Sequence, residues 1–166
     1  MIHELEPRPI HHEAVDAALK KAEQYRLLND PEQAESICLD VLAIEPANER
    51  ALITIILSIT DQFAESGGSG TVRRARQYLD MLTDEYQLVY YAGLICEREA
   101  RGFLARGLAG EFAYGSFYDA IEYYEKADEM SPATDDEAIL RWNSCVRTVR
   151  ARRLRPPTQS VELPLE

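Results

Sequence analysis

Residues 31–46 read PEQAESICLDVLAIEP and residues 117–132 read FYDAIEYYEKADEMSP. In each stretch an Ala is followed by a bulky residue four positions later, then by a small or apolar residue after three more, and then by Pro after another five. These positions are Ala34, Cys38, Val41 and Pro46 in the first stretch and Ala120, Tyr124, Ala127 and Pro132 in the second. The shared spacing indicates the second helix of a repeated helix–turn–helix unit, so we expect an all-α helical solenoid. Solenoids expose a long groove that commonly holds another protein.

Length and composition exclude several classes of protein. The 166 residues, 46% of them apolar, suit one globular domain rather than a disordered or membrane-spanning chain. The densest apolar stretch, residues 51–59, includes Thr54 and Ser58 and is too short to cross a bilayer. Residues 1–13 lack the basic and apolar regions of a secretory signal. The chain also has three isolated cysteines and no CxxC motif. We therefore expect a cytoplasmic protein with buried, reduced thiols.

The net charge of −11 is distributed unevenly along the chain. Residues 1–137 carry 12 Lys and Arg against 27 Asp and Glu, a net −15, whereas residues 138–155 carry six Arg and no acid. The acidic body argues against nucleic acid as a partner, and we also expect no membrane contact. The late arginines suit a solvated helix C-terminus, a contact with an acidic partner or a second copy, or a phosphate contact. They are Arg147, Arg150, Arg152, Arg153 and Arg155.

Apolar periodicity and helix-breaking residues predict seven helices. Their approximate ranges are 11–28, 31–44, 47–65, 71–84, 86–112, 117–130 and 135–153. Asn29-Asp30-Pro31 combines a helix stop with a cap and start for the next helix, and Gly115-Ser116 is interpreted as a break. These elements divide the chain into an extended arm at 1–10, a helical repeat domain at 11–155 and a disordered tail at 156–166.

With these residues in view, the chain resembles the tetratricopeptide repeat family. In the motif of that family, the second helix carries a small, a large and a small residue and then a closing Pro, which residues 117–132 match closely. Residues 15–48 fit one repeat, while the unit at 49–87 departs from the motif through a longer loop and through Gln87 in place of the Pro. The third unit has an overlong first helix. The resemblance covers about residues 15–150 and implies a right-handed solenoid of antiparallel hairpins, with about three repeats and a C-terminal capping helix.

The resemblance also implies a function, that of a non-catalytic scaffold binding a protein or peptide partner. Binding would use the concave face, which the first helix of each repeat forms in this family. Some members clamp a partner's C-terminal carboxylate, but Leu19 and Glu23 occupy matching positions here and cannot bind one. Candidate contacts, expected to be exposed, are Lys20, Glu23, Arg26, Arg50, Thr54, Glu97 and Arg101, and the charge distribution adds Arg150, Arg152 and Arg153.

Two other functions remain open: a structural homodimer joined through the atypical middle units, and a small helical enzyme or ligand carrier. The residues themselves favour no catalytic, metal or cofactor site. His11 and His12 would point about 100° apart on a helix, which does not suit a shared metal. The GGSG loop lacks the Lys-Ser/Thr that follows in a phosphate-binding loop. The acids Glu97 and Glu99 fall on different helix faces.

Overall fold

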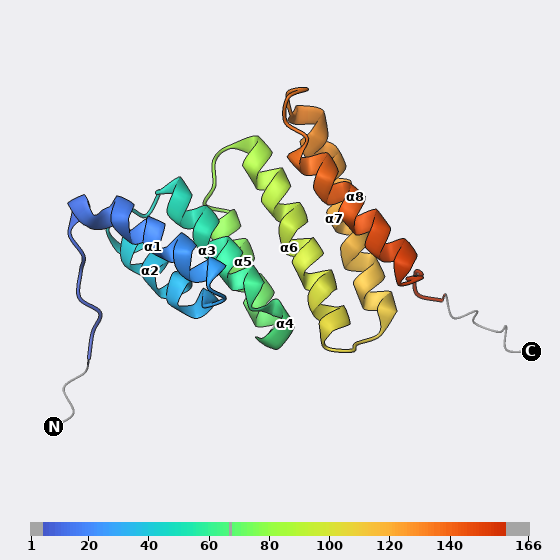
Figure 1. Ribbon diagram of the computed structural model, residues 1–166, viewed down its shortest axis with the longest axis horizontal. Helices are drawn as coiled ribbons and strands as arrows, with labels where there is room; N and C mark the ends of the chain where they lie inside the picture. Colours follow the sequence, from blue (N-terminus) through green and yellow to red (C-terminus); the bar gives the residue numbers. More distant parts are fainter. Residues whose placement is uncertain (1–4, 67, 159–166) are drawn as a thin grey trace, which may run out of the picture.

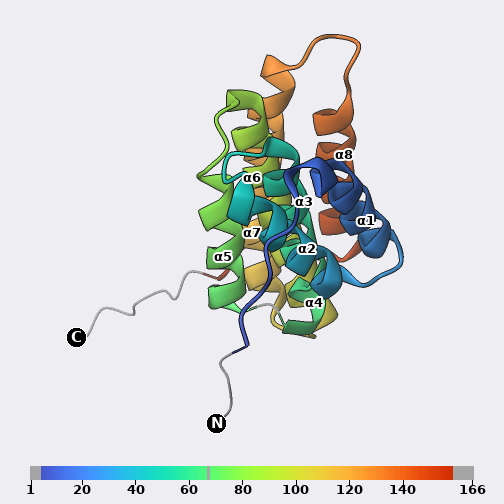
Figure 2. The same ribbon diagram turned by 90° about the vertical axis from the view of Figure 1, so that its left-hand side faces the viewer.

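The computed structural model describes residues 5–66 and 68–158, and all regular structure within them is helical. The elements are η1 (His12–Ala14), α1 (Val15–Leu27), α2 (Pro31–Ile44), α3 (Glu49–Asp61), α4 (Phe63–Ser66), α5 (Ser69–Leu79), α6 (Glu85–Ala105), α7 (Gly110–Met130) and α8 (Glu137–Ala151). The long helices pack in sequence order, except that α5 follows α3 directly and the short α4 lies mainly against α6. Helices α1 and α8 lie at opposite ends of the array (Figure 1). Viewed from the α1 end, α1 and α8 lie on one side and α5 on the other (Figure 2).

Local chemistry determines the turn between α1 and α2, as the sequence predicts. Asn29 adopts a φ of 60°, the left-handed conformation that ends many helices. The Asp30 carboxylate accepts a hydrogen bond from the backbone N–H of Gln33 at 3.3 Å, and Pro31 occupies the first turn of α2. Helix α2 then ends at Ile44, so both of its predicted ends are confirmed.

The helix predicted for residues 47–65 is present as α3, but its predicted end is wrong, because the chain turns at Gln62. Helix α3 ends at Asp61 and α4 begins at Phe63, a residue that is only 2% exposed. The turn places Phe63 against Gly102 of α6, where a Cβ would lie 3.0 Å from the Phe63 carbonyl oxygen. Gly102 therefore allows the close approach of α4 to α6.

The predicted ends of the fourth to sixth helices also differ from the structure. Helix α5 covers residues 69–79 rather than 71–84, because Asp84 instead caps α6 by accepting from the backbone N–H of Gln87 at 2.9 Å. Helix α6 ends at residue 105 rather than near 112, because the chain turns at Gly107, whose φ is +67°. Helix α7 starts at residue 110 and runs through Gly115 without a break. Fully buried Phe117 packs it into the core, and this burial overrides the low helix propensity of glycine.

The ends of the domain agree with the sequence more closely. Residues 5–10 of the predicted arm are non-helical, the 3₁₀ turn η1 precedes α1, and α8 covers 137–151 of the predicted 135–153. Residues 1–4 of the arm and 159–166 of the predicted tail lie outside the described residues. Within the described part of the chain, no helix combines the length and apolar character needed to cross a membrane.

The core combines aliphatic and aromatic side chains with small residues that let neighbouring helices approach closely. Gly93 of α6 lies under α7, where an added Cβ would be 3.0 Å from the Cβ of Tyr123. The thiols of all three cysteines are free and buried, as predicted. Burial raises the pKa of both Cys38 and Cys145 to about 12, which keeps these thiols protonated at neutral pH.

We expect Ala120→Leu to destabilise the fold by about 1–3 kcal/mol, because a larger side chain overpacks a close helix contact. Ala120 is completely buried on α7. Urea denaturation would measure the loss, with Glu125→Leu at an exposed position of the same helix as the matched control. Equal stabilities of the two variants would contradict the close packing of this helix.

Candidate functional site

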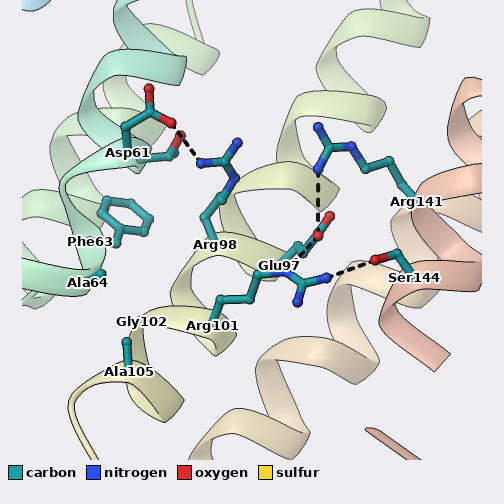
Figure 3. Close-up of a pocket in the computed structure, with 11 residues that line it drawn as sticks. Asp61, Phe63, Ala64, Glu97, Arg98, Arg101, Gly102, Ala105, Arg141 and Ser144 are labelled. Atoms are coloured by element: carbon teal, nitrogen blue, oxygen red, sulfur yellow. Dashed lines mark hydrogen bonds and ion pairs between the residues drawn. The ribbon is translucent and has the colours of Figure 1, made fainter. Parts of the chain in front are cut away.

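A cavity of about 500 Å³ opens between the end of α3, α4, α6 and α8 (Figure 3). Helix α6 forms its central wall, and the end of α3, α4 and α8 form the flanking walls. The charged and polar residues that line it are Thr60, Asp61, Glu97, Arg98, Arg101, Arg141 and Ser144. Three arginines therefore face two carboxylates in one cavity.

Glu97 lies at the base of this cavity and is 1% exposed. One carboxylate oxygen, Oε2, accepts a hydrogen bond from the Tyr124 hydroxyl at 2.7 Å. The other, Oε1, accepts from Arg101 Nε at 2.9 Å and lies 3.6 Å from Arg141 Nη1. A buried carboxylate is tolerated only when such charge-assisted bonds replace its lost water. Glu97 thus fixes side chains from α6, α7 and α8 around one charge.

The same carboxylate influences the protonation of its neighbours. Burial, followed by the charge of Glu97, raises the pKa of the Tyr124 hydroxyl, which therefore remains a hydrogen-bond donor. Burial lowers the pKa of Arg141, but Glu97, Tyr90 and Tyr124 outweigh it, and the net pKa of Arg141 is raised. The arginine is therefore a permanent cation at the cavity wall.

Arg101 is held by four neighbours and spans from α6 to α8. Besides its bond to Glu97, its Nη2 donates to Ser144 Oγ at 3.0 Å and its Nη1 to Thr148 Oγ1 at 3.3 Å. Its guanidinium also lies over the Phe117 ring, 5.5 Å from the ring centroid. These contacts fix the side chain in one orientation while leaving 37% of it exposed.

On the other side of the cavity, the Asp61 carboxylate at the end of α3 pairs with arginines from two other helices. Its Oδ1 accepts from Arg98 Nη1 at 2.7 Å, and its Oδ2 accepts from Arg26 Nε of α1 at 2.8 Å. The side chains of Asp61, Arg26 and Arg98 are 20%, 21% and 27% exposed, so this ion-pair network stays in contact with solvent.

A shallower hollow continues from the cavity along α8. Arg101 and Ser144 line both spaces, and Arg147, Thr148 and Arg152 extend the lining toward the end of the helix. We call the combined surface the arginine groove, defined by Arg98, Arg101, Arg141, Arg147 and Arg152.

The residues proposed from the sequence fall into three places. Glu97 and Arg101 line the cavity, Arg152 lines the adjoining hollow, and Arg26 reaches the cavity through Asp61. The exposure expected for two of them is wrong: Glu97 is buried by its bonds to Tyr124 and Arg101, and Thr54, 4% exposed, lies on the most buried helix, α3.

The remaining candidates lie away from the cavity. Arg50 of α3 donates to both oxygens of Glu23 at 2.7 and 2.9 Å and to Asp16 at 2.9 Å, and Lys20 also pairs with Asp16. The arginine holds the pKa of both carboxyls below their usual values, although Lys20 contributes most at Asp16. The last two candidates, Arg150 and Arg153, are exposed at the end of α8.

Sequence reasoning missed Asp61, Arg98 and Arg141 as members of the site. The sequence held a signal for Arg98, because it lies in the charged segment 97–101 that directly follows the apolar run at 88–96. Arg141 had no such signal, since its role depends on α8 packing against α7 in the folded chain.

The arrangement offers guanidinium groups to a planar anion and places them on rigid helices. Among the residues that the structure describes, no group of three or more His, Cys, Asp or Glu is placed to hold a metal ion. Comparison of the chain with protein-family models, with curated proteins and with solved structures gave no match.

Proposed function

We propose that this chain is a non-catalytic interaction module, a tetratricopeptide-like right-handed solenoid that binds a protein or peptide partner along the arginine groove. The observation that carries the proposal is the cavity between α3, α4, α6 and α8, with Arg98, Arg101 and Arg141 in its walls. The partner would lie across α6, which the resemblance assigns to the concave face as the first helix of the third unit, and across α8, which it assigns as the capping helix.

Preorganisation of the groove supports this function. Arg101 Nε donates to Glu97 at 2.9 Å, and Arg98 Nη1 donates to Asp61 at 2.7 Å. Because these arginine side chains are already ordered, binding a partner would cost little side-chain entropy. The cavity is open to solvent, and polar side chains line it together with apolar ones, a mixture that suits a peptide-binding surface. The helix order and the repeat-like spacing of Ala120, Tyr124 and Ala127, all fully buried, also suit a hairpin array.

Site-specific photo-cross-linking tests the proposal. A benzoylphenylalanine at Ala105, an exposed residue of the cavity lining, should capture a partner protein in an extract of the source cells. The same group at Glu125, exposed on α7 and absent from the cavity lining, is the matched control. Mass spectrometry of the cross-linked bands would identify what is captured.

Equal capture at both positions, or none at Ala105, would contradict binding at the groove. Cross-linking of Ala105 to a second copy of the chain would instead favour the structural homodimer.

A further inference from the structure

We infer that the arginine groove recognises a short extended segment rich in Asp and Glu side chains, carried by a partner protein. The inference rests on the proposed function and adds the chemical class of the partner. The occupant is a stretch within the partner chain, so the carboxylates that bind are those of side chains.

The charge of the groove points to this class. Among the residues that the structure describes, two carboxylates, those of Asp61 and Glu97, line the groove beside its five arginines, and Arg26 contacts Asp61 from behind. The whole chain carries a net charge of −11, so this surface is a basic strip on an acidic protein. Such a strip attracts an acidic segment, and the rest of the surface repels it, which fixes where the segment binds.

The resting contacts show that the guanidinium groups are oriented for carboxylates. Arg98 already binds one oxygen of Asp61, and Arg101 and Arg141 share one oxygen of Glu97. Arg101 and Arg141 are each about a third exposed. The hydrogen bonds of Arg101 to Glu97, Thr148 and Ser144 use three of the five N–H groups of its guanidinium, so two remain to donate to a ligand. A carboxylate entering the cavity would form the same charge-assisted bonds without reorganising the wall.

The dimensions of the groove limit the length of the segment. From Arg141 to Arg152 the helix rises by about 16 Å, which matches about five residues of extended peptide. Before Arg141 the surface becomes acidic again, at Asp135, Asp136 and Glu137. A long, uniformly charged polyanion such as a nucleic acid strand would meet these acids, whereas a short acidic stretch avoids them.

Fluorescence anisotropy with defined probes tests the inference on the full chain. The main probe is a labelled peptide with five consecutive Glu residues, acetylated and amidated so that it has no terminal charge. The comparison probes replace the Glu residues with Gln, replace them with phosphoserine separated by Gly, or consist of a ten-nucleotide oligo(dT). We expect the Glu peptide to bind most tightly, and its affinity to fall as salt is raised.

The matched variants locate the binding. Arg98→Gln together with Arg141→Gln should weaken binding of the Glu peptide by about tenfold or more, because two charge-assisted contacts are lost. The control, Arg8→Gln with Arg73→Gln, removes the same charge at exposed positions outside the groove and should leave the affinity within about twofold of the unchanged chain. Circular dichroism would verify that both double variants fold.

Several outcomes would overturn the inference: no binding of the Glu peptide, equal binding of the Gln peptide, equal losses in both double variants, or tighter binding of the phosphoserine peptide or oligo(dT). The cross-linking experiment at Ala105 distinguishes failure of the two proposals. If the chain captures a partner at Ala105 but does not bind the Glu peptide, the proposed interaction function stands and the inference of an acidic partner fails.

Discussion

Replacing Glu97 with Ala is expected to lower the free energy of unfolding by about 3 kcal/mol, the lower end of the range for breaking a buried ion pair. The variant would leave Arg101 and Arg141 without their carboxylate and the buried Tyr124 hydroxyl without its acceptor. The lower end applies because both arginines are about a third exposed and regain some hydration. Urea denaturation followed by circular dichroism would measure the loss.

Glu97→Gln is the matched control, since its amide oxygen can still accept one hydrogen bond in a side chain of the same shape. Glu97→Gln should lower the free energy of unfolding by less than Glu97→Ala does. The difference between the two losses measures what the side chain contributes beyond its charge. A loss below about 1 kcal/mol for Glu97→Ala would show that water replaces the carboxylate, and the groove would then not depend on it.

Replacing Phe63 with Ala should cost about 3–5 kcal/mol, the usual loss for truncating a buried aromatic side chain. Phe63 is 2% exposed and holds α4 against Gly102 of α6, so the truncation would leave a void behind one wall of the cavity. The thermal midpoint and the urea midpoint should fall together.

Phe112→Ala provides the control for that variant, because it removes the same side chain at a position that is 64% exposed. Its effect should stay within about 0.5 kcal/mol. If both variants lose similar stability, the packing of α4 on α6 is not what anchors this part of the chain.

The boundaries that the sequence predicted correctly are those determined by local chemistry. Asp30 and Pro31 start α2 and Pro46 follows its end, and each signal acts within a few residues. The boundaries that were wrong depend on tertiary packing. Helix α7 continues through Gly115 because Phe117 is buried, and the apolar periodicity of α3 continues past Gln62 although the chain turns there to reach α6.

The site shows the same division. Glu97 and Arg101 could be named from the sequence because the repeat resemblance places them on the first helix of the third unit, within residues 86–112. Arg141 could not, since it lies forty positions after Arg101 and joins the cavity only when α8 packs beside α7. Asp61 was missed because no helix-ending residue near it signals the end of α3.

The order in which the helices pack also bears on how the protein is made. Most contacts join neighbours along the chain, which favours rapid folding that can begin before synthesis is complete. Helices α1 to α5 can assemble while α6 and α7 are still emerging from the ribosome. The cavity, in contrast, requires Asp61 from α3 and Arg141 from α8, so a nascent chain has no arginine groove until α8 is in place. Any acidic segment that this groove holds would therefore be recognised only by a chain that has finished folding.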